Sequence, residues 1–533
     1  MQETANWRVS FIKPRNRGML GAVGAAVLLG FIHFAGAQEI PAIPIPKQPF
    51  AQPVRKFIGQ PAIPNTISAT PVPQHPYMAP NGLSNIHMDG YMSDTYTSAG
   101  PLGHAPTVKS AVLLGLGGTV TFDSAGRIII MALGNGSRRL LLLDPVTLGI
   151  EAAFQLPSPP PAASLPRSVE TSFGGGGYYF LDELDRAVLP TADRRIWVVE
   201  EVSGPRPRFA LADSCDPQVP EDQDIQSVLP DAQGRLWFTT SGTTDANGNA
   251  TSPAWVGTLV FTSSTECTVK TLQLNPPTTP TYESISKSFA VDPAGGVFIV
   301  SDYAMYRFDA ASDGTPQITW REAYDRGTPP IKPGQIQVGS GTTPTLMGSD
   351  FVTIADNAVP QMHVVVYRRA AQVQGSRLLC AVPVFEPGES ATENSLIATN
   401  KSIIVENNYG YYGPAATSLG RATEPGISRI DINDDQSGCH AVWTNQERVP
   451  SVVSQMSLAT GLVYTYTKDP GPGITDAWYL TAIDFATGNT AYKRLGGTGL
   501  LYNNHYSAVY LGPDQKTAYV GVVGGIIAIR DRY

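Results

Sequence analysis

Short apolar runs divided by Gly, Asp and Asn turns fill the chain from about residue 85 to its C-terminus, and no long stretch has helical periodicity. One unit recurs: a strand, a tight turn that holds Asp and Gly, and a strongly apolar strand. It is clearest in TFDSAGRIIIM (121–131), LPDAQGRLWFT (229–239) and VDPAGGVFIVS (291–301). The Asp side chain caps the turn and Gly accepts a positive φ, so each copy predicts a β-hairpin.

A second unit often follows the first: an apolar strand that ends in Asp, a turn, and a strand that ends in an aromatic residue. The pairs are Asp144 with Phe154, Asp309 with Trp320, Asp431 with Trp443, and Asp484 with Tyr492. Two hairpins in tandem form a four-stranded antiparallel sheet, which is the blade of a β-propeller. The pattern therefore predicts an all-β protein.

The spacing of the first unit predicts the number of blades. Turn centres near residues 123, 193, 231, 292, 350, 400, 459 and 514 indicate eight four-stranded blades. Seven blades stay possible, because the copies near 193 and 231 are close together. The last unit supplies only three strands before Tyr533, so we expect a strand from residues 85–115 to complete it and close the ring. We predict a single propeller over residues 83–533.

The repeat resembles that of a known superfamily. Ala482, Asp484, Thr487 and Gly488 match the A-x-D-x-x-T-G-x-x-x-W repeat of quinoprotein (PQQ) dehydrogenase-like propellers, with Tyr492 in place of the usual tryptophan. The resemblance implies the fold more than an activity. Quinone-dependent members commonly carry a vicinal disulfide and repeated tryptophan docking motifs, and the sequence shows neither. This argues against pyrroloquinoline quinone as the cofactor, and the superfamily also includes assembly scaffolds that bind none.

The N-terminal region has the pattern of a targeting segment. A basic stretch at 8–17 precedes an apolar run at 18–32 and small residues at 35–37. This predicts a signal peptide over residues 1–37 and export to the periplasm or beyond, with an uncleaved anchor as the alternative. Residues 38–82 are Pro-rich and are expected to form an extended linker.

Charge and cysteine content narrow the partners. The net charge is −8 and no Lys/Arg-rich run follows the N-terminal region, so neither nucleic acid nor membrane integration after signal cleavage is expected.

Four cysteines in an oxidising compartment allow two disulfides with three connectivities. We expect Cys215–Cys267 and Cys380–Cys439, because each pair joins neighbouring repeat units; four free thiols are the alternative.

Candidate site residues are those just before each inner strand, since inner strands begin at one mouth of a propeller's central funnel. If the predicted register holds, a ring of carboxylates and amides converges on the axis. Its members are Glu170, Asp224, Glu283, Asp350, Glu393, Asn394, Gln455, Asn504 and His505. The alternative is that these groups only solvate a water-filled channel.

Oxygen ligands of this kind suit Ca²⁺. The site type is similar to the axial calcium site of SMP-30/gluconolactonase-like and paraoxonase propellers, although no motif of those families aligns. That resemblance implies Asp350, Glu393 and Asn394 as metal ligands, with Glu283 or His505 as the base that activates water toward a lactone or ester.

A small organic ligand is expected in the funnel, bound by Glu170, Asp224 and Asn504 and by Asn408 and Tyr409 of the polar, aromatic segment 403–414. An ordinary turn with packed tyrosines is the alternative for that segment. The first hypothesis is an exported Ca²⁺-dependent lactone or ester hydrolase. The others are a quinoprotein-like oxidoreductase and a non-catalytic envelope scaffold or binding propeller with a protein partner, which a funnel plugged by side chains favours.

Overall fold

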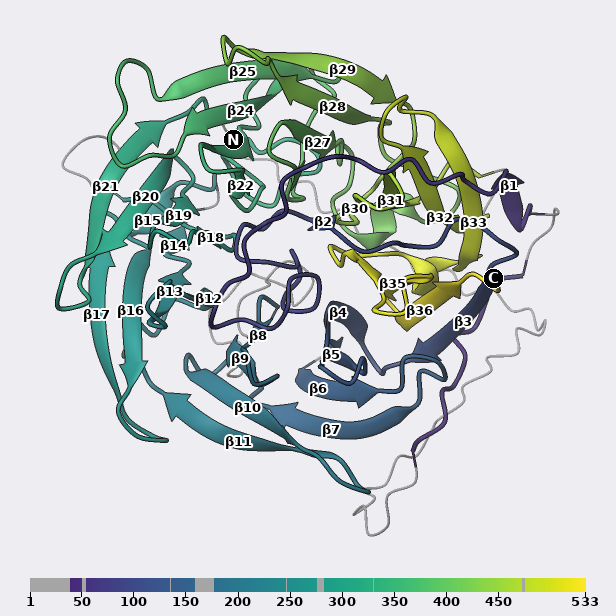
Figure 1. The fold of residues 1–533 in the computed structure, drawn as a ribbon, viewed down its shortest axis with the longest axis horizontal. Helices are drawn as coiled ribbons and strands as arrows, with labels where there is room; N and C mark the ends of the chain where they lie inside the picture. The colour runs from purple at the N-terminus through teal and green to yellow at the C-terminus, as the bar shows by residue number, and fades with distance from the viewer. Residues whose placement is uncertain are drawn as a thin grey trace, which may run out of the picture. The chain divides into compact units, whose positions relative to one another are not determined.

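The computed structural model describes residues 39–49, 54–134, 136–158, 177–245, 247–275, 282–328, 330–471 and 475–533. These residues form eight four-stranded antiparallel blades around one axis (Figure 1). The prediction of an eight-bladed β-propeller is confirmed. Within these ranges, no helix has the length and apolarity needed to cross a membrane.

The first four blades follow one another along the chain. Blade 1 contains β4 (Leu116–Phe122), β5 (Ile128–Gly134), β6 (Ser137–Leu143) and β7 (Ile150–Leu156). Blade 2 contains β8 (Phe180–Leu181), β9 (Ala187–Pro190), β10 (Ile196–Val202) and β11 (Arg208–Cys215). Blade 3 contains β12 (Ile225–Pro230), β13 (Leu236–Thr240), β16 (Trp255–Phe261) and β17 (Cys267–Gln273), with the hairpin β14 (Thr243–Thr244) and β15 (Ala250–Ser252) inserted. Blade 4 contains β18 (Ala290–Val291), β19 (Val297–Val300), β20 (Ala304–Ala310) and β21 (Pro316–Ala323).

The next three blades have the same order. Blade 5 contains β22 (Thr345–Met347), β23 (Phe351–Ala355), β24 (Met362–Arg368) and β25 (Leu378–Val384). Blade 6 contains β26 (Ile397–Ala398), β27 (Ser402–Glu406), β28 (Ile427–Ile432) and β29 (Cys439–Asn445), with the 3₁₀ turn η1 (Pro414–Thr417) in its long β27–β28 loop. Blade 7 contains β30 (Gln455–Ser457), β31 (Leu462–Thr467), β32 (Ala477–Asp484) and β33 (Thr490–Thr498), followed by the 3₁₀ turn η2 (Leu500–Tyr502).

The ring closes as predicted. Blade 8 takes β34 (Val509–Leu511), β35 (Thr517–Val522) and β36 (Gly525–Arg530) from the C-terminus, and β3 (Thr107–Val112) from the N-terminal part of the chain is its outermost strand. Strand β3 is antiparallel to β36 over its whole length. The two ends of the propeller sequence are therefore held in one sheet.

Turn chemistry explains the repeated hairpins. The Asp231 carboxylate accepts hydrogen bonds from the backbone N–H groups of Gln233 and Arg235, and from the Arg235 and Trp237 side chains. Gly234 has φ +81°, as the turn requires. Each such turn is closed by residues within six positions of one another, so it forms from local sequence alone.

One predicted turn was wrong. The centre near 193 lies between the second and third strands of blade 2, and the first hairpin turn of that blade is at residues 182–186. There Asp182 accepts from Leu184 N–H and Arg186 N–H, while Asp185 with φ +59° stands where blades 1, 3 and 4 have Gly. The corrected turn evens the spacing and removes the seven-blade alternative.

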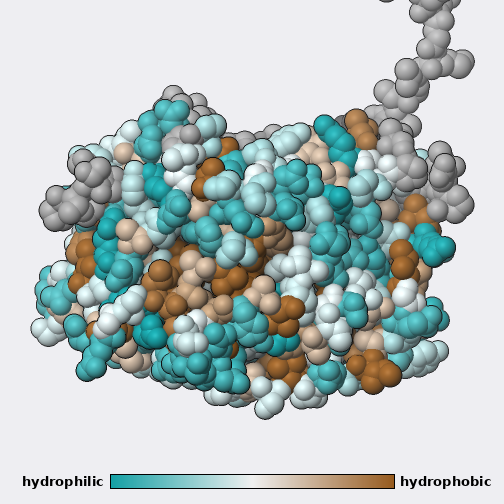
Figure 2. Space-filling view, turned by 90° about the horizontal axis from the view of Figure 1, so that it is seen from above, coloured by the Kyte–Doolittle hydropathy of each residue, from teal (hydrophilic) through white to brown (hydrophobic). Residues whose placement is uncertain are grey.

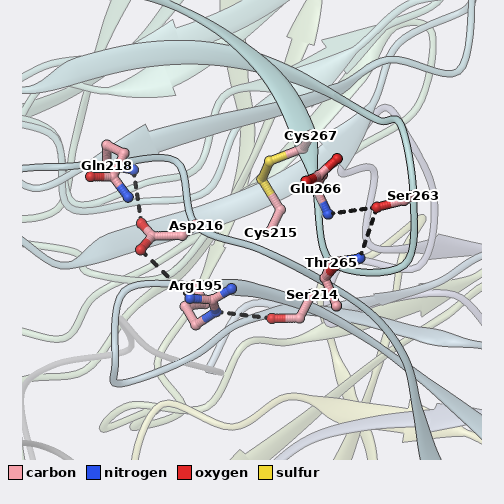
Figure 3. Close-up of a disulfide and its surroundings, with 9 residues drawn as sticks. All are labelled: Arg195, Ser214, Cys215, Asp216, Gln218, Ser263, Thr265, Glu266 and Cys267. Carbon is pink, nitrogen blue, oxygen red and sulfur yellow. Dashed lines mark hydrogen bonds and ion pairs between the residues drawn. A yellow bond between two sulfur atoms is a disulfide. The ribbon is translucent and has the colours of Figure 1, made fainter.

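The two preferred disulfides are confirmed. Cys215 at the end of β11 bonds to Cys267 at the start of β17 (Figure 3), and Cys380 in β25 bonds to Cys439 in β29. Each joins the outermost strands of neighbouring blades. Such bonds are compatible with an oxidising compartment. The predicted signal peptide lies outside the described residues, so export stays a prediction.

The outermost strands form the rim of the disc. In β25 and β29 side chains alternate between more and less exposed positions, as expected for strands that face water on one side. Figure 2 looks onto this rim and shows a mostly hydrophilic surface with apolar side chains gathered near its middle. The main apolar packing lies between neighbouring blades.

The described part of the Pro-rich segment lies against the ring and belongs to the same compact unit. Strand β1 (Phe57–Gly59) pairs with β33 at the outer edge of blade 7. Ile45 is buried, and the backbone N–H groups of Asn65 and Ile67 donate to Thr460 and Leu458 of blade 7.

The next residues, 82–98, lie inside the ring and are called the axial segment below (purple in the centre of Figure 1). Its carbonyl groups accept backbone hydrogen bonds from six blades, at Phe122, Leu181, Val291, Leu346, Ala398 and Met456. Strand β2 (Thr95–Tyr96) of the segment pairs in parallel with β30. The chain itself therefore fills the axis at the level where inner strands end.

Candidate functional site at the propeller axis

A histidine and a carboxylate of the axial segment form a fully buried pair. His87 Nδ1 lies 3.0 Å from Asp94 Oδ2 and 3.1 Å from Oδ1, and the two side chains are 2% and 0% exposed. The Gln455 amide of blade 7 donates to Asp94 Oδ1 at 2.6 Å. Burial raises the pKa of Asp94, while His87 and Gln455 act in the opposite direction.

The other ring nitrogen of His87 faces two hydroxyl groups. His87 Nε2 lies 3.3 Å from Ser395 Oγ of blade 6 and 3.4 Å from Thr343 Oγ1 of blade 5. Ser395 Oγ also accepts from the Thr343 N–H at 3.1 Å. A carboxylate that holds Nδ1–H leaves Nε2 as an acceptor, so the order carboxylate, imidazole, hydroxyl is that of an activated serine.

The loops before two inner strands supply an ion pair. The Lys287 ammonium, before β18, lies 2.5 Å from Glu393 Oε2, before β26, and both side chains are at least nine-tenths buried. Glu393 Oε1 accepts from Ile336 N–H at 2.9 Å. Glu393 is two residues before Ser395, so this pair helps to fix the loop that carries the Ser395 hydroxyl before β26.

Asn394, predicted as a metal ligand, contacts a second buried carboxyl. Its Nδ2 donates to Glu406 Oε2 at 2.8 Å and to Val452 O at 2.7 Å. Glu406 Oε1 accepts from Ser454 N–H at 2.8 Å. Burial raises the pKa of Glu406 from 4.5 to about 7.

Glu283, predicted as a base, is fully buried in blade 4. Its carboxylate accepts from the hydroxyls of Ser301 and Tyr306 and from the Arg321 guanidinium, which lies 2.5 Å from Oε1. These contacts join β20 and β21 to the loop before β18. The observed role of Glu283 is to hold Arg321.

His505, the other predicted base, contacts the long β27–β28 loop of blade 6. Its Nδ1 lies 2.9 Å from the Tyr411 hydroxyl. Asn504 Nδ2 donates to Ser507 O and Gly521 O, and the Asn504 carbonyl accepts from Tyr411. The pair therefore anchors this loop against blade 8.

Asn408 and Tyr409, predicted to bind ligand, begin the same loop. Asn408 Oδ1 accepts from Glu393 N–H at 2.9 Å, and its Nδ2 donates to Val449 O at 3.1 Å. Tyr409 is partly exposed. Asn408 thus supports the loop residues just before Ser395.

Asp350 does not lie with the other predicted metal ligands. The inner strand of blade 5 begins at Thr345, so Asp350 is an exposed residue of the β22–β23 turn, at the opposite end of the inner strand from Glu393 and Asn394. The predicted register was wrong for this blade because its turn lacks the usual Asp-x-x-Gly order. Among the described residues, no three His, Cys, Asp or Glu side chains are grouped to hold a metal ion.

Two of the predicted ligand-binding residues remain, Asp224 and Glu170. Asp224 is partly buried before β12, and its charge acts on Arg138 of blade 1. Glu170 lies outside the described residues. Sequence reasoning missed His87, Asp94, Lys287, Thr343 and Ser395. A run of two Asp and one His in NIHMDGYMSD (85–94) was the available signal, but no repeat marks its place in the ring.

Comparisons with known proteins leave the family open. No family model matches the sequence. An uncharacterised protein of Archaeoglobus fulgidus is 26% identical over 271 residues, which are 46% of this chain and 51% of that protein. The chain therefore spans about half the length of the curated relative it matches.

Among solved structures, a Bacteroides fragilis protein assigned as a 6-phosphogluconolactonase has 12% identity and TM-score 0.36, with 61% of this chain and 83% of that chain covered. A luciferin-regenerating enzyme has 12% identity and TM-score 0.29, covering 64% and 94%. Sqt1 of Chaetomium thermophilum has 12% identity and TM-score 0.37, covering 86% and 98%. At these levels they assign no activity, and neither the quinoprotein nor the SMP-30 resemblance is confirmed as family membership.

Proposed function

We propose that the protein is a hydrolase of a small ester or lactone, with Ser395 as nucleophile, His87 as general base and Asp94 as the residue that positions His87. The observation that supports this is the continuous series from Asp94 through both nitrogens of His87 to Ser395 Oγ, at 3.0 and 3.3 Å. Contacts of this length join the members of serine hydrolase triads on unrelated folds.

The chemistry follows from the tautomer. Asp94 keeps the proton on Nδ1, so His87 Nε2 accepts the Ser395 proton as Oγ attacks the carbonyl carbon. The tetrahedral intermediate then collapses, the alcohol oxygen leaves with the proton from His87, and water hydrolyses the acyl-serine by the same route. Ser395 is only 7% exposed, so the substrate is small.

The first test compares wild type with Ser395→Ala on p-nitrophenyl acetate and on simple γ- and δ-lactones. We expect Ser395→Ala to lose at least about 10³-fold in kcat/KM. Ser227→Ala is the matched control, because Ser227 is also a buried serine, in blade 3, and bonds only Ser288 in the described contacts. A fluorophosphonate should label the Ser395 peptide in wild type. Turnover that survives Ser395→Ala would remove the proposal.

A specific observation favours a second candidate, a non-catalytic binding or scaffold propeller in the cell envelope. The axial segment bonds to six inner strands and buries His87 and Asp94. On this view the buried pair only fixes the segment. Absence of turnover and of labelling in the wild-type protein would support this candidate over the first.

A further inference from the structure

The carboxyl groups near the axis outnumber the cations that face them. Asp89, Asp94 and Glu406 are 1%, 0% and 3% exposed. His87 pairs with Asp94, and in the described part of the chain neither Asp89 nor Glu406 makes an ion pair with Lys, Arg or His. Asp89 is satisfied within its own segment by Ser93 and by the Tyr91 N–H. Glu406 has no such local set.

Two amide oxygens beside these carboxyls have no hydrogen-bond partner among the described residues. They are Asn394 Oδ1 and Gln455 Oε1, on side chains that are 1% and 0% exposed. The nitrogen of the Asn394 amide donates to Glu406, and that of the Gln455 amide donates to Asp94. Each unpaired oxygen therefore belongs to an amide already held against a buried carboxylate. A buried carbonyl without a partner is costly, so this pattern indicates a missing partner that accepts oxygen ligands.

We propose that a calcium-class cation binds between blades 6 and 7, with Glu406 and the amide oxygens of Asn394 and Gln455 as its ligands and with Asp94 supplying further negative charge. The donors are all oxygen, which suits a hard cation and not zinc. Blade 6 supplies Asn394 and Glu406, and blade 7 supplies Gln455, so the cation joins two blades. The predicted calcium site thus shifts from Asp350 and Glu393 and keeps only Asn394.

The test is calcium titration of EDTA-treated protein that contains residues 39–533. Binding is measured by calorimetry and by thermal unfolding. We expect one Ca²⁺ per chain and a Tm that rises with Ca²⁺ concentration, because the ligand binds only the folded state. Mg²⁺ is expected to bind more weakly, since it requires a tighter octahedral site.

Glu406→Gln keeps the shape of the side chain and one of the two hydrogen bonds that its carboxylate accepts from Asn394 and Ser454. We expect it to weaken Ca²⁺ binding at least about tenfold. Gln455→Met, which removes the amide oxygen, should weaken it as well. Asp350→Asn is the control and should bind as wild type. Water in place of a cation gives no binding and no Tm shift, and that result, or equal affinity in Glu406→Gln, overturns the proposal.

The Tm of Glu406→Gln in the absence of Ca²⁺ shows whether this variant folds. Without Ca²⁺, Glu406→Gln loses one accepted hydrogen bond and removes a buried unpaired charge; because these effects oppose each other, its Tm should stay close to that of wild type at pH 7.5. Ser395→Ala should bind Ca²⁺ normally, so failure of the hydrolase proposal and failure of the cation site are separate results.

Discussion

The hairpin turns of the blades and the axial segment both bury aspartates, but they hold them differently. Asp231 in a blade turn is bonded by Gln233, Arg235 and Trp237, all within six residues of it. Asp94 on the axis is bonded by His87 and by Gln455, which is 361 positions away. A carboxylate of the first kind stabilises its own turn. One of the second kind is assembled only when the ring closes, and it is placed beside groups that can react.

The largest expected effect is on ester hydrolysis, and it distinguishes Asp94 on the axis from Asp231 in a blade turn. Asp94→Asn keeps the side-chain shape but no longer holds His87 in the Nδ1–H tautomer, so kcat for ester hydrolysis should fall roughly 10³- to 10⁴-fold. Asp231→Asn weakens the contact with Arg235 and should lower the free energy of unfolding by about 1–3 kcal/mol while kcat stays near the wild-type value. Steady-state kinetics and urea unfolding of both variants make the comparison. Equal kcat in Asp94→Asn and wild type would show that the axial pair is structural.

The same contrast explains what sequence could predict. Seven of the eight hairpin turns were placed correctly because their polar residues and glycines act within the turn; the signal is strongest in the Asp-x-x-Gly turns of blades 1, 3 and 4 and weaker in the others. The turn at 182–186 was missed because Asp185 takes the Gly position. His87 and Ser395 are 308 residues apart, and nothing in the repeat states that the segment before the first blade enters the ring. The accuracy of the other site predictions depended on the predicted strand register. Glu393 and Asn394 do lie before an inner strand, as predicted, whereas Asp350 lies after the end of one.

A second, smaller effect is the pH dependence that the buried Glu406 carboxyl gives to folding. Burial raises the pKa of Glu406 from 4.5 to about 7, so between these pH values the folded protein keeps a proton that the unfolded chain has released. Folding therefore becomes less favourable as pH rises through this window, by about 3 kcal/mol for this group.

Urea unfolding in EDTA at pH 5 and pH 7.5 measures this effect. Glu406→Gln does not titrate, so between pH 5 and pH 7.5 its free energy of unfolding should gain about 2 kcal/mol on that of wild type, which is most of the full effect. Saturating Ca²⁺ should reduce the difference, because a bound cation favours the carboxylate. A wild-type pH profile that parallels the Glu406→Gln profile would contradict the buried, unpaired state of Glu406.

The smallest expected effect is on the free energy of unfolding of two glycine variants. It separates backbone strain inside a hairpin turn from a contact between the turn and a distant residue. Gly126 and Gly234 have φ +79° and +81° in equivalent turns of blades 1 and 3. A Cβ at Gly126 meets nothing within 4 Å, so Gly126→Ala should cost only the left-handed backbone conformation, about 1 kcal/mol. A Cβ at Gly234 comes within 2.9 Å of the Tyr77 ring, in the Pro-rich segment, so Gly234→Ala should cost more.

A double-mutant cycle isolates that excess. Tyr77→Ala removes the ring from Gly234, and in this background Gly234→Ala should cost the same as Gly126→Ala, with a coupling of about 0.5–1 kcal/mol. If the two glycine variants already have equal unfolding free energies with Tyr77 present, the Pro-rich segment does not press on blade 3 in solution. In that case the hairpin turns depend on local sequence alone. The contrast with the axial segment, whose contacts come from residues far away in the sequence, would then be larger than the structure indicates.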